Sequence, residues 1–229
     1  VMGQKNQLWW DIPASESFLL NKHIYNIEDK RFNKILDELV DLLDVKDKID
    51  IQVRRLSLGE RMKMEIIASL LHEPSIVLLD EPTLGLDVIS QSKIRDFVKY
   101  HNEQYKTTFV ITSHYTKDIQ EMCQRVFVLN KGKQIYDGDF KKLIKKVNPL
   151  RKLIYEFPSI PNDEMINTLS SDFTFTLNNN IISAELNEEK LQNLLSSLLQ
   201  IEAPKNLIYE DLPVDETMRN FFENPEKYL

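Results

Sequence analysis

The sequence predicts an α/β protein in which a parallel sheet is followed by a small α+β module. The first observation is a set of short apolar or β-branched runs that alternate with helical stretches, as in parallel α/β sheets. These expected strands are residues 76–79, 107–112 and 126–129. The second observation is the order β-α-β-β-α-β after about residue 147, which predicts a ferredoxin-like module. We therefore expect two domains, residues 1–146 and residues 147–229.

Helical periodicity precedes the first strand, over about residues 20–71. One apolar stripe, with the spacing i, i+4, i+7 and i+8, consists of Ile35, Leu39, Leu42 and Leu43. A further helix should begin at Ser57, because Ser57 and Glu60 have the spacing of a capping box. It should end before Pro74, since the residue before a proline disfavours helical backbone.

The remaining elements follow from changes in the hydrophobic period. The run 76–79 is apolar and unbroken, which predicts a parallel strand covered on both faces, and 126–129 should be another buried strand. Gly132 should turn the chain into a hairpin with residues 134–136. The expected helices are 91–105, 116–123, 163–169, 191–199 and 217–222. The expected strands of the module are 151–157, 173–177, 181–186 and 206–209.

Composition limits the possible functions. The 229 residues are 42% apolar and carry a formal net charge of -7. The negative balance argues against sequence-independent binding of nucleic acid, which requires clustered Lys and Arg, so we expect no nucleic-acid partner. Cys123 is the only cysteine, which excludes an internal disulfide. No apolar run approaches the ~20 residues of a membrane-spanning helix.

Two adjacent carboxylates, Asp80 and Glu81, follow the apolar strand 76–79. Open α/β sheets bind ligands at the carboxyl ends of their strands. An aspartate there can hold Mg²⁺, which prefers oxygen ligands, and a neighbouring glutamate can orient or deprotonate an attacking water. The alternative is a strand end with two solvated acids.

Two further positions have the residue types of a phosphate site. Ser57 and Gly59 lie at an expected helix start, where free N–H groups and the helix dipole favour an anion. The alternative, a simple capping box, is compatible with this function. His114 follows the strand 107–112, where an imidazole can contact a phosphate or a water; the alternative is a structural histidine.

Four motifs, in this order and spacing, resemble those of ABC-transporter ATP-binding subunits. They are Leu-Ser-Leu-Gly-Glu (56–60), Leu-Leu-Asp-Glu-Pro (78–82), Gly-Leu-Asp (85–87) and Thr-Ser-His (112–114). The opening segment, residues 3–11, is similar to the Q-loop region of the ABC-2 type export subfamily. The resemblance covers about residues 1–145 and, more weakly, the module that follows. It implies part of a P-loop NTPase domain, with a helical subdomain and a parallel sheet.

The resemblance implies a role for each matching residue. Asp80 would be the Walker B aspartate that binds Mg²⁺. Glu81 would be the catalytic base and His114 the switch histidine. Gln4 would be the Q-loop glutamine that senses Mg²⁺ and the γ-phosphate, and Gln7 is the alternative for that role.

The same resemblance assigns the other motif residues to a second nucleotide. The signature residues Ser57, Leu58, Gly59 and Glu60 would bind ATP held by another subunit, and Asp87 would be the D-loop residue that crosses the dimer. These roles require a head-to-tail dimer, expected to be a homodimer, with ATP and Mg²⁺ as cofactors.

The sequence departs from the family pattern in three places. The usual signature has Gly at the position of Leu58 and Gln at the position of Glu60. Leu at the first of these positions is common in this subfamily. Glu60 brings a negative charge near a triphosphate, which the helix N-terminus offsets in part. No G-x-x-x-x-G-K-[ST] loop occurs, and the chain opens on Val1. We interpret the chain as a fragment from the Q-loop onward that should not bind ATP tightly by itself.

The resemblance implies an ATP-hydrolysing subunit of an ABC-2 type exporter, cytoplasmic and peripheral on the inner face of the membrane, with a transmembrane permease as partner. Residues 147–229 would be an accessory or regulatory domain. Two alternatives remain: a soluble ABC ATPase without a transport role, and a truncated fragment that acts only by interaction. Trp9 and Trp10 would contact the permease, unless one of them belongs to the core.

Overall fold

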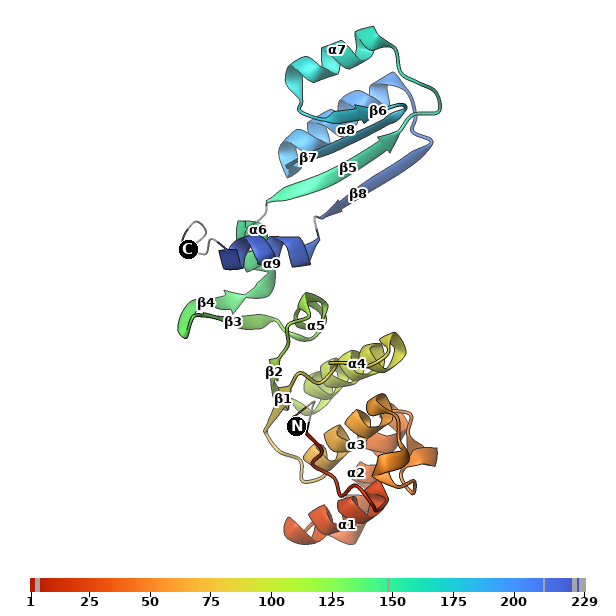
Figure 1. The fold of residues 1–229 in the computed structure, drawn as a ribbon, viewed down its shortest axis with the longest axis vertical. Helices are drawn as coiled ribbons and strands as arrows, with labels where there is room; N and C mark the ends of the chain where they lie inside the picture. Colours follow the sequence, from red (N-terminus) through yellow and green to blue (C-terminus); the bar gives the residue numbers. More distant parts are fainter. Residues whose placement is uncertain (3–4, 148, 212, 224–225, 227–229) are drawn as a thin grey trace. The chain divides into compact units, whose positions relative to one another are not determined.

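A computed structural model describes residues 1–2, 5–147, 149–211, 213–223 and 226 of the protein (Figure 1). The described chain forms two compact units, Val1–Cys123 and Gln124–Leu229. The sequence-based domain boundary at 146/147 lies further along the chain and stays a prediction. Each unit is described by itself.

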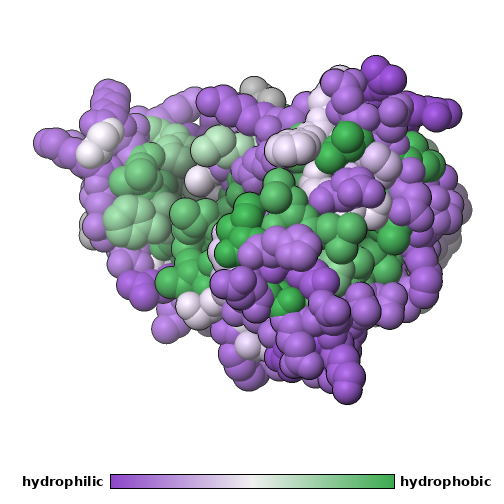
Figure 2. Space-filling view, turned by 90° about the horizontal axis from the view of Figure 1, so that it is seen from below, coloured by the Kyte–Doolittle hydropathy of each residue, from purple (hydrophilic) through white to green (hydrophobic). Residues whose placement is uncertain are grey.

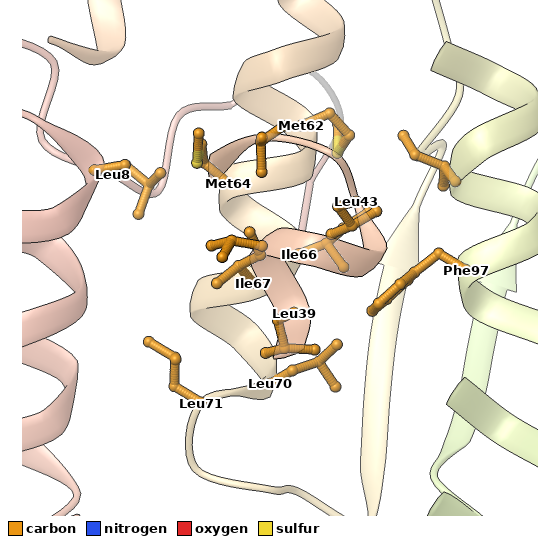
Figure 3. Packing of buried hydrophobic residues seen from close by; sticks show 14 of the residues in the cluster. Leu8, Leu39, Leu43, Met62, Met64, Ile66, Ile67, Leu70, Leu71 and Phe97 are labelled. Carbon is orange, nitrogen blue, oxygen red and sulfur yellow. The ribbon is translucent and has the colours of Figure 1, made fainter. Parts of the chain in front are cut away.

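The first half of the first unit is helical. Its elements are α1 (Ala14–Ile24), α2 (Asp29–Leu42), two 3-10 turns at Lys46–Lys48 and Val53–Arg55, and α3 (Leu58–Leu70). Leu39 of α2 and Leu43 are buried together with Ile66, Ile67 and Leu70 of α3 (Figure 3). The stripe predicted from the helical spacing therefore faces the core. The predicted capping box is confirmed, since Ser57 and Glu60 bond each other's backbone N–H groups.

The second half of this unit contains a parallel strand pair. Its elements are β1 (Ile76–Asp80), α4 (Val88–Tyr105), β2 (Thr108–Thr112) and α5 (Thr116–Met122). Leu79 of β1 stands beside Ile111 of β2. On the other side of β1, Met2 forms an isolated parallel bridge with Asp80. Helix α4 begins three residues before the predicted start at residue 91, because the Asp87 side chain caps it.

One face of β1 and β2 is open, which corrects the prediction that residues 76–79 are covered on both faces. Val77 and Leu79 are buried in the cluster that contains Phe97 of α4, whereas Ile76 and Leu78 are 58% and 62% exposed. Val110 of β2 is also exposed. Among the described residues the buried cluster lies on one side of the pair, so the burial alternates along β1.

The second unit begins with an antiparallel hairpin, β3 (Arg125–Asn130) and β4 (Lys133–Asp139), followed by α6 (Phe140–Val147). The hairpin was predicted, but the burial of 126–129 was not predicted correctly. Phe127 and Leu129 are exposed, and only Val128 is buried. Within the described chain β3 pairs with β4 and is separate from the β1–β2 pair. A short apolar run does not by itself distinguish a buried strand from a hairpin strand.

The rest of the second unit has the predicted β-α-β-β-α-β order. It consists of β5 (Leu150–Glu156), α7 (Asp163–Asp172), β6 (Thr176–Asn178), β7 (Ile181–Asn187), α8 (Glu188–Ile201), β8 (Asn206–Asp211) and α9 (Val214–Glu223). The sheet order is β6-β7-β5-β8, and all pairs are antiparallel. Leu153 and Tyr155 of β5 are buried with Leu191, Leu194 and Leu198 of α8. The ferredoxin-like prediction is confirmed.

No helix among the described residues has the length and apolar character needed to cross a membrane.

Candidate functional site

The carboxyl ends of β1 and β2 bring together three of the residues that the sequence singled out. His114 Nδ1 lies 2.9 Å from Glu81 Oε2, although the two residues are 33 positions apart. Asp80 precedes Glu81 and accepts a hydrogen bond from the Thr112 hydroxyl at Oδ1. The sequence analysis gave Thr112 no site role. Its position at the carboxyl end of β2, beside Asp80 in the register of the two strands, is the signal that could have identified it.

The backbone at Glu81 directs the two carboxylates differently. Glu81 has φ 50°, in the left-handed region that few non-glycine residues adopt. This conformation is held by the Glu81 amide, which donates to the Thr112 carbonyl at 3.0 Å and to its hydroxyl at 3.2 Å. The Glu81 carbonyl also accepts from the Leu84 amide at 3.2 Å. Such strain is typical of functional positions.

The donor set at this edge fits a Mg²⁺ ion that arrives with a nucleotide. Asp80 is exposed, and its Oδ1 already accepts the Thr112 hydrogen bond. Among the described residues no group of three His, Cys, Asp or Glu side chains could hold a metal ion. Mg²⁺ commonly takes one or two carboxylates, several waters and the phosphates of its substrate. One carboxylate beside a hydroxyl is consistent with that kind of site.

The N-terminus of α3 is closed by the capping box. Ser57 Oγ accepts from the Glu60 amide at 3.2 Å, and the Ser57 amide donates to Glu60 Oε2 at 2.9 Å. The amides of Leu58 and Gly59 lie in the first turn, where the helix itself provides no acceptor. The Glu60 carboxylate is therefore engaged by the cap, and Lys48 Nζ lies 3.9 Å from its Oε1.

The 56–60 turn packs against the start of α4. A Cβ atom at Gly59 would lie 2.4 Å from Ser90 Oγ and 2.8 Å from Ser90 Cβ. Ser90 is fixed there, because Asp87 accepts from its amide at 2.9 Å and from its hydroxyl at 2.6 Å. These hydrogen bonds hold the pKa of Asp87 below its ordinary value. Gly59 is thus buried against Ser90 and Asp87, next to Ser57, and Ser90 is a residue of this contact that sequence reasoning missed.

Gly85 completes this contact. Its φ of 74° is in the left-handed region, and a Cβ there would lie 3.2 Å from Leu58 Cδ2. Leu58 is half-buried and belongs to the periphery of the core cluster. The side chain that departs from the usual signature therefore faces the protein.

The first segment of the chain lies against α3. Gln4 is outside the described residues. The Gln7 amide donates to Glu65 Oε1 at 3.4 Å, and Glu65 of α3 is 2% exposed. Trp9 and Trp10 are 63% and 43% exposed, so neither belongs to the core. The Arg61 guanidinium lies over the Trp10 ring, 5.2 Å from its centroid.

A cavity of about 320 Å³ adjoins this segment. Its walls include Gln7 and Leu8, Tyr25 at the end of α1, and His72 after α3. The rings of Tyr25 and His72 stack with centroids 4.0 Å apart. Exposed apolar side chains of α1 continue the surface, and Figure 2, seen from the α1 end, shows hydrophobic residues gathered there between hydrophilic ones.

Glu65 should make stability depend on pH. Burial raises the pKa of its carboxyl from 4.5 to about 7, while the Gln7 amide and Arg61 act in the opposite direction. Between these pH values the folded state binds more protons than the unfolded state, so the free energy of unfolding should fall as pH rises. Thermal unfolding from about pH 5 to about pH 8 measures this dependence. Glu65→Gln should abolish the fall of the unfolding free energy with pH, and at the upper end its unfolding free energy should exceed that of the wild type by on the order of 1 kcal/mol.

The exposed Glu103 offers a matched control on α4. Glu103→Gln should leave the pH dependence of the unfolding temperature as in the wild type. A wild-type slope that survives Glu65→Gln would contradict the assignment to Glu65.

Three comparisons place this geometry among known proteins. Residues 14–116 match a family model described as "AAA domain, putative AbiEii toxin, Type IV TA system". The ABC transporter ATP-binding protein YdbJ of Bacillus subtilis (strain 168) is 31% identical over 140 residues, which are 58% of this chain and 46% of that protein. The Nod factor export ATP-binding protein I of Neorhizobium galegae is 25% identical over 218 residues, or 90% of this chain and 60% of that protein.

A solved structure agrees with these relatives. The cbiO1 protein of Clostridium perfringens, part of the ABC transporter complex cbiONQ, has a TM-score of 0.52 and 26% identity, and the match covers 62% of this chain and 59% of that chain. The chain spans about half the length of the curated relatives it matches. The solved structure shares the fold, and the family model matches the stretch that contains residues 57–60, 80–81 and 114.

Proposed function

We propose that the protein hydrolyses ATP with Mg²⁺ to power an ABC-2 type exporter, since the chain is similar to the ATP-binding proteins of ABC transporters. The observation that carries this proposal is the His114–Glu81 pair, with 2.9 Å between Nδ1 and Oε2, next to Asp80 at the carboxyl ends of two parallel strands. The arrangement supplies a metal-binding carboxylate, a base and an imidazole at one edge.

The side chains would divide the work of an in-line attack of water on the γ-phosphate. Asp80 would hold Mg²⁺, which supplies charge neutralisation when bound. Glu81 has Oε2 engaged by His114, so its Oε1 would orient the water and accept its proton. His114 would bond Glu81 through Nδ1 and face the terminal phosphate with Nε2.

The second surface would act on another nucleotide. The α3 N-terminus, with Ser57 and the amides of Leu58 and Gly59, presents donors suited to a γ-phosphate. Asp87 lies against the same turn. We propose that this surface faces ATP held by a second subunit in a homodimer, and that Gln4 senses Mg²⁺ in cis.

The cavity beside Gln7 supports a role for a transmembrane permease as partner. It lies next to two exposed tryptophans and the apolar side of α1. A short amphipathic helix of the permease would fit such a groove. The protein would then lie in the cytoplasm, peripheral on the inner face of the membrane. Residues 1–146 would be the ATPase domain and residues 147–229 an accessory or regulatory domain.

The test is release of phosphate from Mg-ATP by the protein expressed from its complete gene. We expect turnover that requires Mg²⁺ and whose specific activity rises with protein concentration, because the proposed site needs two subunits. Asp80→Asn should abolish it, whereas Asp96→Asn on the exposed side of α4 should not. ATP binding without any turnover would favour an interaction role and refute the enzyme proposal. Turnover independent of protein concentration would refute the dimer.

A further inference from the structure

A buried charged cluster lies behind the proposed catalytic edge. Asp118 of α5 and Arg95 of α4 are 1% and 4% exposed, and Thr83 is fully buried. Asp118 Oδ1 accepts from Arg95 Nη1 at 2.9 Å. Asp118 Oδ2 accepts from the Thr83 hydroxyl and, at 3.1 Å, from Ser113 Oγ. Three side chains from three segments thus converge on one carboxylate.

The cluster is costly as a purely stabilising device. Moving two charges out of water carries a desolvation penalty, and their attraction compensates it only when the geometry is good. Well-packed apolar residues in the same place often stabilise a fold at least as much. Arg95 Nε lies 2.7 Å from Glu121 Oε2 as an ion pair, but it makes no aligned hydrogen bond there. What a fully bonded buried carboxylate does supply is a fixed relative position for its partners.

Those partners belong to the segments that carry the proposed site. Thr83 is two residues after Glu81, and its carbonyl accepts from the Leu86 amide at 3.2 Å and from Gln91 Nε2 at 3.3 Å. These bonds shape the turn that leads to Asp87. Arg95 lies on α4, the helix that Asp87 caps.

The third partner leads to the histidine. Ser113 immediately precedes His114, and its hydroxyl also accepts from the Tyr115 amide at 3.0 Å. Ser113 Oγ is therefore bonded on one side to the backbone after His114 and on the other to Asp118. Displacing the Asp118 carboxylate would displace the segment that carries His114.

We propose that Asp118 is a positioning residue that holds the Asp87 turn and the His114–Glu81 pair in one arrangement. A shift of the Asp87 turn, which the second subunit would contact, then reaches His114 through Arg95, Asp118 and Ser113. This inference rests on the proposed function and adds to it a route by which the partner subunit regulates hydrolysis.

The first test is kinetic and uses the protein from its complete gene. Asp118→Asn leaves one acceptor oxygen for three donors, so at least one donor loses its partner. We expect kcat to fall about 10-fold to 100-fold, with KM for ATP changed less than about twofold, because misplaced groups act on the chemical step. Asp118→Glu should recover part of the loss, and Asp96→Asn should have no effect. An unchanged kcat per folded molecule would overturn the proposal.

A double-mutant cycle tests the connection itself. Asp87→Asn keeps the helix cap but removes the charge, and its effect on kcat should be smaller in the Asp118→Asn background than in the wild type. Additive losses would show that Asp87 and Asp118 act independently. Thr83→Val removes one bond to Asp118, and Ser113→Ala removes the bond to Asp118 together with the one from the Tyr115 amide. Both variants keep the Arg95–Asp118 ion pair, so they extend the test if Asp118→Asn does not fold.

An NMR experiment tests the positioning role of Asp118 independently of the proposed function. The ring nitrogen resonances of His114, recorded by NMR, should shift in Asp118→Asn and in Thr83→Val but not in Asp96→Asn. This readout needs no ATP turnover. A wild-type protein without turnover would refute the proposed function alone, whereas unchanged His114 resonances in a folded Asp118→Asn variant would refute the positioning role alone.

Discussion

Replacing Glu81 with glutamine is expected to lower the rate of ATP hydrolysis about a hundredfold to ten-thousandfold. The amide has nearly the shape of the carboxylate, and its oxygen can still accept from His114 Nδ1, which lies 2.9 Å from Glu81 Oε2 in the wild type. It has no basic oxygen left to take the proton of the attacking water. Single-turnover phosphate release measures the loss, and equilibrium binding of ATP should stay within a few-fold of the wild type.

Two further observations decide whether Glu81 is the base. Glu103→Gln, an exposed substitution of the same chemistry on α4, should leave the rate unchanged. In the presence of ATP the Glu81→Gln protein should accumulate as the proposed dimer, because ATP bound between the subunits would no longer be hydrolysed. Wild-type turnover in Glu81→Gln would exclude Glu81 as the base.

Gly59→Ala should both destabilise the first unit and abolish ATP-driven association. A methyl group at this position would lie 2.8 Å from Ser90 Cβ and 2.4 Å from Ser90 Oγ, closer than unstrained atoms approach. Ser90 cannot simply rotate away, because its hydroxyl and amide both bond Asp87. Overpacking of this kind costs about 1–3 kcal/mol. Denaturant unfolding measures the loss of stability, and sedimentation with ATP measures association.

The contact provides its own control. Ser90→Gly removes the Cβ and the hydroxyl that meet the new methyl group, so the double variant Gly59→Ala/Ser90→Gly should recover most of the lost stability. Ser90→Gly alone should cost less than Gly59→Ala. If the double variant were no more stable than Gly59→Ala, the damage would have a cause other than the contact with Ser90.

Structural features that depend on residues a few positions apart, such as helix caps, could be predicted from the sequence. The capping box at Ser57 depends on two residues three positions apart, and both bonds are present. The cap at Asp87 has the same logic, with Ser90 three residues on, but it was overlooked and the start of α4 was placed too late. The exposure of Phe127 and Leu129 in β3 could not be predicted, because a short apolar run does not show whether its strand is buried or belongs to an open hairpin.

The candidate site shows the same division. His114 and Glu81 each follow an expected parallel strand, so their proximity follows from strand pairing. The approach of Gly59 to Ser90 and the convergence on Asp118 depend on how helices pack. Sequence spacing does not predict such contacts, because they form between side chains from segments that are distant in the chain. The roles assigned to the motif residues stay predictions that the variants above would test.

The open face of β1 and β2 has a practical consequence for anyone who purifies this chain. Ile76, Leu78 and Val110 are exposed apolar side chains, with Leu78 and Val110 adjacent on the paired strands, and exposed apolar surface of this kind favours self-association and precipitation. Oligomers formed through it would need neither nucleotide nor magnesium and would grow with temperature, as hydrophobic association does. Light scattering from the isolated chain would then report nonspecific association through this apolar face. Only association that appears on addition of ATP would report the proposed dimer.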